Sequence, residues 1–186
     1  KDGVLPSLYF TEDIMLKPLE ICDFDKVYKI MDESFPSDER RSYDGQKKLF
    51  EEDEYRIFAR YDGEDVTAFI ALWDFEDFAY IEHFAVSEKC RNGGIGAKML
   101  AEILKVFNKT VCLEVEPPEN EIAQRRIKFY ERNGFFLNNF EYLQPSLGDG
   151  KGEIPLLVMT SGKSADRRGF EKIRNVLYEK VYRVKK

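Results

Sequence analysis

Three glycines within four positions, Gly93, Gly94 and Gly96, form the most constraining feature of this sequence. A glycine in or beside a helix costs about 1 kcal/mol relative to alanine. The strand-like run "AYIEHFAV" (79–86) precedes the glycines, and the amphipathic run "AKMLAEILKVF" (97–107) follows them. Glycines at a helix start leave backbone N–H groups open to an anion, because no Cβ stands in the way. The stretch therefore predicts an anion-binding turn at a helix N-terminus.

Two common phosphate-binding motifs do not match this turn. The dinucleotide pattern G-x-G-x-x-G would require a glycine where Met99 stands. The P-loop pattern G-x-x-x-x-G-K-S/T fails because Lys98 does not follow a glycine and precedes Met99. The remaining pattern, R-x-x-G-x-G, consists of Arg91, Gly94 and Gly96. On its own, this pattern is also compatible with a tight turn that only begins a helix.

Hydrophobic periodicity predicts alternating strands and helices along the chain. The predicted order, β-α-α-β-β-β-α-β-α-β-β-α, indicates one α/β domain with a mixed sheet of about six or seven strands, flanked by helices. The expected domain is 1–186, with a core of about 14–161 and an added C-terminal amphipathic helix. Because a helix separates them, strands 79–86 and 110–116 are expected to be parallel. The expected strands are 14–19, two in 55–75 joined at Asp62–Gly63, 79–86, 110–116, 135–144 and 153–161; the expected helices are 23–35, a short one in 36–54, 97–107, 120–134 and 164–184.

Residues that commonly cap or end helices support these boundaries. A short polar side chain at a helix start accepts a backbone N–H, and a glycine past the end adopts a left-handed conformation. The expected caps are Asp23 or Asp25 for the first helix, Asn120 for 120–134 and Ser164 or Asp166 for the last helix, with Gly134 as a terminator.

Composition and charge exclude several functional classes. The formal net charge of -6 argues against nonspecific binding of nucleic acid or an anionic membrane. The three cysteines, Cys22, Cys90 and Cys112, argue against a disulfide scaffold or a zinc site, and the single histidine, His83, argues against a histidine-based metal centre. No apolar run approaches about 18 residues, and the first residues lack the features of a signal peptide. We expect a cytoplasmic protein without a metal, a membrane span or a nucleic-acid partner.

The context of the glycine turn indicates a family. The turn follows a strand, opens an amphipathic helix, and is followed by a further strand and then by "KFYERNGF" (128–135). In this arrangement the chain resembles the GNAT superfamily of acetyl-CoA-dependent N-acyltransferases. The resemblance covers 55–135 most strongly, and the order of elements agrees over about 14–160. It implies acetyl-CoA as co-substrate and an amine as acceptor.

The resemblance also implies where coenzyme A binds. Backbone amides of the loop would hold the pyrophosphate, and the end of strand 79–86, splayed from 110–116, would pair with the pantetheine arm like an added strand. Asn120 would contact the cofactor, although it lies ten residues before Tyr130 rather than the family's usual seven. Arg126, in place of the family's alanine, would either reach a coenzyme phosphate or be solvated. The implied cofactor residues are Phe84, Ala85, Val86, Arg91, Asn92, Gly93, Gly94, Ile95, Gly96, Ala97, Asn120 and Arg126.

Acetyl transfer to an amine requires a neutral amine, donors for the oxyanion and a proton for the leaving thiolate. A backbone amide near 84–86 is the expected oxyanion donor. Tyr130 matches the tyrosine of the family's F-Y-E motif, and a phenol with a reference pKa of about 10 is protonated at neutral pH. The alternative is that Tyr130 only packs on its helix face.

Glu82 is the main candidate for the base. Strand alternation places it on the face of Tyr80, Phe84 and Val86, where apolar neighbours would raise its pKa. The family's usual acid position, six residues before the valine, holds Tyr80 instead, and a salt-bridged or solvated Glu82 is the alternative. His83 is expected on the opposite face, packed or exposed, and is a minor alternative for the base. Glu116 is a reserve candidate, and neither Cys90 nor Cys112 is expected to carry the acyl group.

The acceptor side is expected in the least regular parts: the segment "ESFPSDERRSYD" (33–44), the loop 145–152 and the strand end around Trp73. The segment's carboxylates would receive a cationic amine, whereas its arginines would bind a carboxylate, and these options imply opposite substrates. A charged, solvated turn is the alternative. The candidates are Glu33, Asp38 and Glu39 for an amine, and Arg40 and Arg41 for a carboxylate.

Three functions remain open at this point. The first is an N-acetyltransferase that acts on a primary amine of a small molecule or peptide by direct attack in a ternary complex. The second is a non-catalytic acyl-CoA sensor. The third is an interaction module whose C-terminal helix docks on its own sheet or on a second subunit, as in a homodimer.

Overall fold

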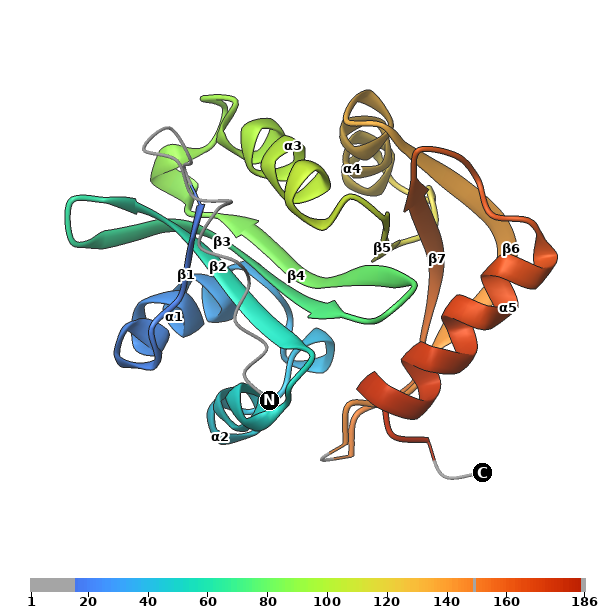
Figure 1. The fold of residues 1–186 in the computed structure, drawn as a ribbon, viewed down its shortest axis with the longest axis horizontal. Coiled ribbons are helices and arrows are strands. Elements are labelled where there is room, and N and C mark those ends of the chain that lie inside the picture. The colour runs from blue at the N-terminus through green and yellow to red at the C-terminus, as the bar shows by residue number, and fades with distance from the viewer. Residues whose placement is uncertain (1–15, 149, 185–186) are drawn as a thin grey trace. The chain divides into compact units, whose positions relative to one another are not determined.

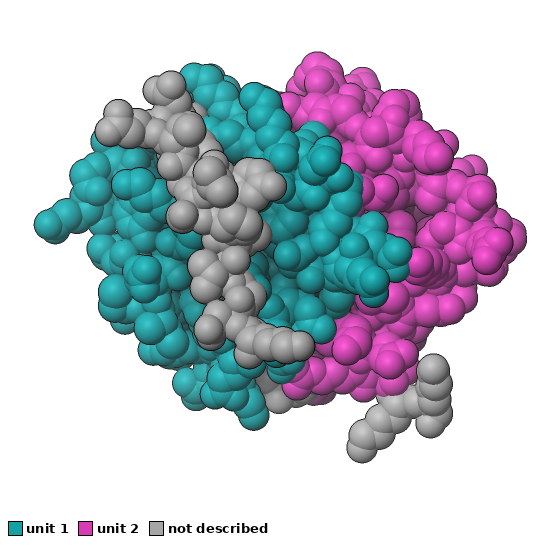
Figure 2. All heavy atoms as spheres, in the orientation of Figure 1, with its two compact units in different colours: residues 1–109 teal, residues 110–186 magenta. Residues whose placement is uncertain are grey.

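The computed structural model describes residues 16–148 and 150–184. The chain separates into two units, Lys1–Lys109 and Thr110–Lys186, which Figure 2 shows in different colours. Each unit has its own strands and helices, as Figure 1 shows. Ile14 and Met15, the start of the first expected strand, lie outside the described residues.

The first unit contains four antiparallel strands in the order β1-β2-β3-β4. The predicted hairpin is confirmed: Gly63, with φ of +61°, lies in the turn between β2 and β3. β3 is buried along nearly its whole length because helices cover both faces of this sheet. The strands are β1 (Leu16–Pro18), β2 (Tyr55–Asp62), β3 (Asp65–Asp74) and β4 (Phe78–Val86).

Three α-helices accompany this sheet. α1 (Phe24–Ser34) and α2 (Tyr43–Lys47) lie on one face, and α3 (Ile95–Phe107) lies on the other (Figure 1). Both long helices are amphipathic, as their sequence periodicity predicts. Their buried side chains are Phe24, Val27, Ile30 and Met31 in α1, and Met99, Leu100, Ile103 and Phe107 in α3.

A β-bulge interrupts the pairing of β3 with β4. Leu72 pairs with Ile81 and Ala71 pairs with His83, so Glu82 is an extra residue that has no partner in β3. A bulge of this kind changes the direction of the side chains around it. The strict alternation that the sequence predicted for β4 therefore fails at the position of the candidate base.

The second unit contains β5 (Thr110–Val115), α4 (Glu121–Arg132), β6 (Phe135–Gln144), β7 (Ile154–Ser161) and α5 (Arg167–Val176). β7 lies between β5 and β6 and is antiparallel to both. The expected C-terminal helix is confirmed, and it continues as one π-helical turn at Leu177–Val181. The α/β fold class is confirmed, whereas the single domain and the parallel pairing of 79–86 with 110–116 stay predictions.

The helix caps are confirmed in the second unit and wrong in the first. Asn120 Oδ1 accepts the Ala123 N–H at 2.9 Å, and Gly134, with φ of +83°, follows the end of α4. Asp166 Oδ1 caps α5 through the Gly169 N–H at 2.7 Å. Asp23 stands at the N-cap position of α1 without forming a side-chain cap. Its carboxylate instead pairs with Lys26 and accepts the Tyr61 hydroxyl.

Candidate active site

The glycine turn has the backbone of an anion-binding loop. Asn92 and Gly94 both adopt left-handed conformations, with φ of +66° and +73°. Gly94 is the N-cap residue of α3 and provides no side-chain cap. A Cβ on Gly94 would meet no atom within 4 Å among the described residues, and 91–94 are exposed. The space over Gly94 is thus open to a ligand.

The first turn of α3 leaves amides available for that ligand. Lys98 N–H donates to Gly94 O at 3.2 Å, which is the bond that begins the helix. The amides of Ile95, Gly96 and Ala97 precede that bond and lie at the positive end of the helix dipole. Such amides bind phosphate well. The predicted cofactor loop Arg91–Ala97 therefore fits a pyrophosphate.

Arg91 connects this loop to the strand before it. Its Nε donates to the backbone carbonyl of Val86 at 3.1 Å, at the end of β4. On the β3 side, Phe84, Ala85 and Val86 keep a regular register. None of these contacts tests the predicted pairing of their backbone with the pantetheine arm, which stays a prediction.

Glu82 forms a buried ion pair, as in the salt-bridged alternative to its role as base, with a partner that the sequence did not predict. Arg41, in the segment between α1 and α2, places Nη1 at 2.5 Å from Glu82 Oε1. The side chains of Arg41 and Glu82 are only 12% and 4% exposed. The segment 33–44, which we assigned to the acceptor side, thus contributes directly to the surroundings of the candidate base.

This ion pair reverses the expected pKa of Glu82. Burial alone would raise the pKa, but the attraction of Arg41 and of the His83 ring outweighs it, so the pKa lies below its ordinary value. The prediction of a raised pKa is wrong because it considered only the apolar neighbours on the strand. Glu82 remains ionised at neutral pH and is a weaker base than expected.

His83 lies in the same buried cluster. Its Nε2 is 2.9 Å from the carbonyl oxygen of Glu39, and a carbonyl only accepts, so Nε2 carries the proton. Burial lowers the pKa of His83, which leaves Nδ1 as a bare acceptor. Nδ1 lies 3.7 Å from Glu82 Oε2. Of the two states expected for His83, packed or exposed, the structure shows the packed one, but its separation from Glu82 on the opposite face is wrong because of the bulge.

Trp73 lies beside Glu82 rather than on an open strand end. It is 1% exposed, and its ring centroid is 5.2 Å from that of Tyr55. Gln46 Nε2 in turn donates to the Tyr55 hydroxyl at 2.6 Å. We call Arg41, Trp73, Glu82 and His83 the Glu82 cluster. Within the described part of the chain, four buried atoms here lack a hydrogen-bond partner: Gln46 Oε1, Trp73 Nε1, Glu82 Oε2 and His83 Nδ1.

The other predicted acceptor residues have different positions. Arg40 turns towards α1, where it pairs with Asp32 and donates to the Tyr28 hydroxyl at 2.8 Å. Glu39 reaches the cluster through its backbone carbonyl. Glu33 is exposed on α1. The two adjacent arginines thus serve separate contacts, and Arg41 rather than Arg40 reaches the candidate base.

The predicted residues of the second unit lie on and before α4. Tyr130 is 8% exposed, packs against the rings of Phe129 and Phe135, and has a pKa raised to about 12 by burial. Its phenol therefore keeps its proton at neutral pH. Arg126 pairs with Glu116 at 2.7 Å. Asn120 uses its side-chain oxygen as the helix cap described above.

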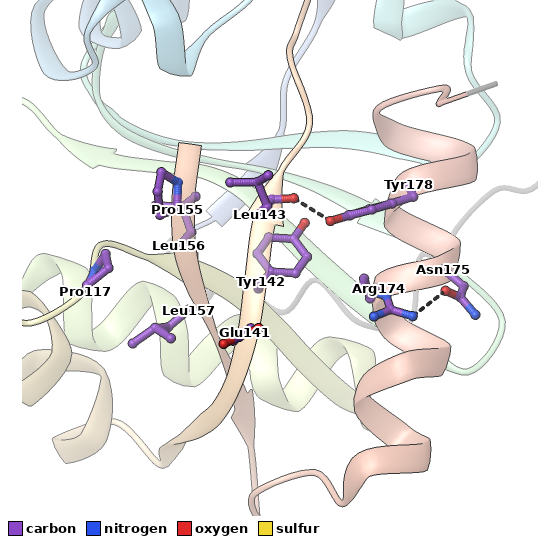
Figure 3. A pocket seen from close by; sticks show the side chains of 10 residues that line it. All are labelled: Pro117, Glu141, Tyr142, Leu143, Pro155, Leu156, Leu157, Arg174, Asn175 and Tyr178. Carbon is purple, nitrogen blue, oxygen red and sulfur yellow. Dashed lines mark hydrogen bonds between the residues drawn. The ribbon is translucent and has the colours of Figure 1, made fainter. Parts of the chain in front are cut away.

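A cavity of about 580 Å³ opens in the second unit between β6, β7 and α5 (Figure 3). At its edge the Tyr178 hydroxyl donates to the Leu143 carbonyl at 2.5 Å. Among the described residues, neither the loop 145–152 nor the predicted cofactor and catalytic residues line it. Its lining residues are Pro117, Glu141, Tyr142, Leu143, Pro155, Leu156, Leu157, Arg174, Asn175 and Tyr178.

Comparison with known proteins decides the family. The sequence model of the Acetyltransferase (GNAT) family matches residues 24–135, which is more than half of the chain. The chain belongs to the GNAT family. A provisionally named GNAT acetyltransferase from Bacteroides thetaiotaomicron is 33% identical, with a TM-score of 0.83 over 92% of this chain and 100% of that one. YjbC of Bacillus subtilis (strain 168), also provisionally named as an acetyltransferase, is 26% identical over 85% of this chain and 82% of its own.

A more distant structure shares the fold alone. The ribosomal-protein-alanine N-acetyltransferase from Brucella melitensis is 15% identical, with a TM-score of 0.61 over 80% of this chain and 99% of that one. Together these comparisons confirm the GNAT fold and the acyltransferase activity predicted from the glycine turn and "KFYERNGF". Members of the GNAT family use acetyl-CoA and amine acceptors.

Sequence reasoning missed Arg41 as a partner of the base and gave His83 a minor place. A signal for His83 was present in "IEHF", where two adjacent polar residues interrupt an apolar strand. Two such neighbours cannot both face solvent on a regular strand, so one of them must be buried or the strand must bulge. No comparable signal distinguishes Arg41 from Arg40.

Two further observations concern residues 16–148 and 150–184. Over these ranges, no helix combines the length and apolar character needed to cross a membrane. In the same ranges, His, Cys, Asp and Glu side chains do not gather in groups of three or more suited to a metal ion.

Proposed function

We propose that this GNAT protein transfers an acetyl group from acetyl-CoA to a primary amine of a small molecule or peptide, by direct attack in a ternary complex. The observation that carries the proposal is the start of α3: Gly94 leaves the helix without a side-chain cap and with open space above it. A helix start without a cap leaves donors unsatisfied unless a ligand or water supplies the acceptor. The coenzyme A pyrophosphate is such an acceptor.

The cofactor roles follow from the loop. The amides of Ile95, Gly96 and Ala97 bind pyrophosphate oxygens, while Arg91 holds the loop against the end of β4 through the Val86 carbonyl. The backbone of Phe84–Val86 lies directly before this loop in the chain, where the extended pantetheine arm would continue from the pyrophosphate. A backbone amide of that strand end donates to the oxyanion as it forms.

Bound acetyl-CoA supplies the thioester carbonyl. The amine nitrogen forms a bond to the carbonyl carbon, the carbon–sulfur bond breaks, and the amine gives up one proton to the Glu82 cluster. Tyr130, which keeps its proton at neutral pH, protonates the departing thiolate. A cysteine acyl carrier is disfavoured because burial raises the pKa of the Cys112 thiol well above its ordinary value.

The test is calorimetric titration of acetyl-CoA and desulfo-CoA into the wild type, Gly94→Ala and Gly63→Ala. Gly94 and Gly63 are matched, because both have positive φ and a Cβ on either meets nothing within 4 Å among the described residues. Both variants lose about 1 kcal/mol of stability from backbone strain. We expect only Gly94→Ala to lose affinity for coenzyme A, by about 10-fold, since its Cβ enters the pyrophosphate space.

Thiol release measured with a panel of amines then identifies the acceptor. Equal affinity of Gly94→Ala and Gly63→Ala for acetyl-CoA would refute the assignment of the glycine turn as the pyrophosphate site. Binding of acetyl-CoA without turnover on any amine would favour an acyl-CoA sensor instead.

A further inference from the structure

The Glu82 cluster contains buried polar atoms whose hydrogen-bonding capacity is unused. Glu82 Oε2, His83 Nδ1 and Trp73 Nε1 have no hydrogen-bond partner within the described residues, although their side chains are almost wholly buried. Buried polar groups in proteins are nearly always hydrogen-bonded. Three such atoms in one cluster therefore indicate that it holds a small polar molecule.

The geometry and donor pattern suit one water. Glu82 Oε2 and His83 Nδ1 are both acceptors, and at 3.7 Å they are too far apart for a shared proton. The indole N–H of Trp73 is a donor whose approach lowers the pKa of Glu82 without reaching the geometry of a direct hydrogen bond. A water donates one hydrogen to each acceptor and accepts from Trp73, which gives the usual number of about three hydrogen bonds for a buried water.

We propose that Glu82, His83 and Trp73 bind one buried water, and that His83 Nδ1 takes up through it the proton released by the acceptor amine. This inference rests on the proposed function. As the amine attacks, one N–H proton moves to the water oxygen and one water proton moves to Nδ1, so the water is regenerated and the imidazole becomes imidazolium. Glu82, the residue that sequence analysis favoured as base, then holds the charge that stabilises this imidazolium.

The contacts of His83 favour this division of roles. Protonation at Nδ1 leaves the Nε2–H bond to the Glu39 carbonyl intact, so the ring accepts a proton without turning. Glu82 Oε1 is already held by Arg41, which weakens the carboxylate as a base. The ring of Phe35 also packs against His83, with the two ring centroids 4.9 Å apart.

Several charged groups act on His83. Burial opposes the imidazolium most strongly, Glu82 and the hydrogen bond to the Glu39 carbonyl favour it, and Arg41 and Arg40 oppose it. The Tyr55 phenol interacts electrostatically with Glu82. The net effect is a pKa below the ordinary 6.5 of histidine, so His83 is neutral and able to accept a proton at pH 7. Transfer of its proton back to solvent after each turnover is correspondingly favourable.

NMR of the wild-type protein provides the first test, and it needs no activity. His83 is the only histidine of the chain, so protein labelled with ¹⁵N-histidine gives a single pair of imidazole signals. We expect the Nε2–H tautomer and titration below pH 6.5, moved lower still by Glu82→Gln. An Nδ1–H tautomer, or a pKa that Glu82→Gln leaves unchanged, would overturn the proposal.

The second test uses kinetics. In His83→Gln the side-chain amide can keep the donor to the Glu39 carbonyl but offers no titrating base. We expect kcat/KM to fall by about 100-fold and the acid limb of its pH profile to disappear, while acetyl-CoA affinity is unchanged. A reduced rate with the wild-type pH profile would show a purely structural role for His83 and refute the proposal.

Different results would refute the acetyltransferase function and the proton role of His83. A wild type that binds no acetyl-CoA and releases no thiol refutes the proposed function. An active wild type whose pH profile survives His83→Gln refutes only the proton role of His83.

Discussion

The glycine turn and the Glu82 cluster occupy the same unit of this GNAT protein, and they are built in opposite ways. The turn consists of consecutive residues, Arg91–Ala97, and offers backbone amides at an exposed helix start. The cluster consists of side chains from three separate parts of the chain, and it is buried. A site made of consecutive backbone can be recognised in a sequence. A site made by tertiary contact needs the fold.

The two sites should also respond differently to mutation. Changes in the turn alter ligand affinity at a small cost in stability, because its groups face open space. Changes in the cluster alter both stability and chemistry, because every group there is desolvated and depends on its neighbours.

Removal of the buried carboxylate should have the largest effect on stability. Glu82→Ala leaves the Arg41 guanidinium desolvated without its partner, and we expect the free energy of unfolding to fall by about 3 kcal/mol or more. Urea denaturation measures this loss. In the double variant Arg41→Met and Glu82→Leu, most of the stability should return. If the single variant is as stable as the wild type, the ion pair is not a structural element.

Tyr130→Phe isolates one hydroxyl on a buried helix face. The phenylalanine keeps the packing against Phe129 and Phe135 but cannot donate a proton to the thiolate. We expect kcat to fall by about 100-fold with acetyl-CoA affinity unchanged. Steady-state kinetics together with calorimetry distinguish this from a packing role, which would leave kcat near the wild-type value.

The pH dependence of stability includes a contribution from the Glu82 cluster. Glu82 and His83 both have pKa values lower in the folded than in the unfolded state, so the unfolded chain binds more protons as the pH falls. Their stabilisation is present above the unfolded values, 6.5 for His83 and 4.5 for Glu82, and is lost as the pH falls below each. Each group adds a slope of at most about 1.4 kcal/mol per pH unit.

Urea midpoints measured between pH 8 and 5 should therefore decline more steeply for the wild type than for His83→Gln. Well above pH 6.5, where His83 is neutral in both the folded and the unfolded chain, the two curves should run parallel. Parallel curves over the whole range would mean that His83 keeps an ordinary pKa.

The smallest expected effect, about 1 kcal/mol in the free energy of unfolding, concerns the helix cap at Asn120. Asn120→Ala removes the cap bond to the Ala123 N–H and should lower stability by about that amount, whereas Asn120→Asp keeps the cap. Asp166→Asn is the matched control at the start of α5. If Asn120 only caps α4, Asn120→Asp binds acetyl-CoA like the wild type. Loss of that binding would restore the cofactor contact that the family resemblance implies.

Features made of consecutive residues could be predicted from the sequence, whereas features made by tertiary contacts could not. The hairpin at Gly63, the start of α3 at Gly94 and the caps at Asn120 and Asp166 depend on local conformational preferences, which a short stretch contains. The Arg41–Glu82 pair joins residues 41 positions apart, and nothing local distinguishes Arg41 from Arg40. The pKa of Glu82 was mispredicted for this reason, because one distant arginine reversed the effect of burial.

The bulge at Glu82 also constrains how this stretch of chain can vary in length. Deleting Glu82 would make Ile81 and His83 neighbours in a regular strand, still paired with Leu72 and Ala71, so the residues on both sides of the bulge would keep their register. The carboxylate and its contacts with Arg41 and His83 would be lost. A deletion elsewhere in β4 would instead shift the register and turn the following side chains to the other face. Relatives that share both sites should therefore differ only by substitution between Phe78 and Arg91, and this stretch should keep its length. Insertions and deletions should be confined to hairpin tips such as the turn at Gly63.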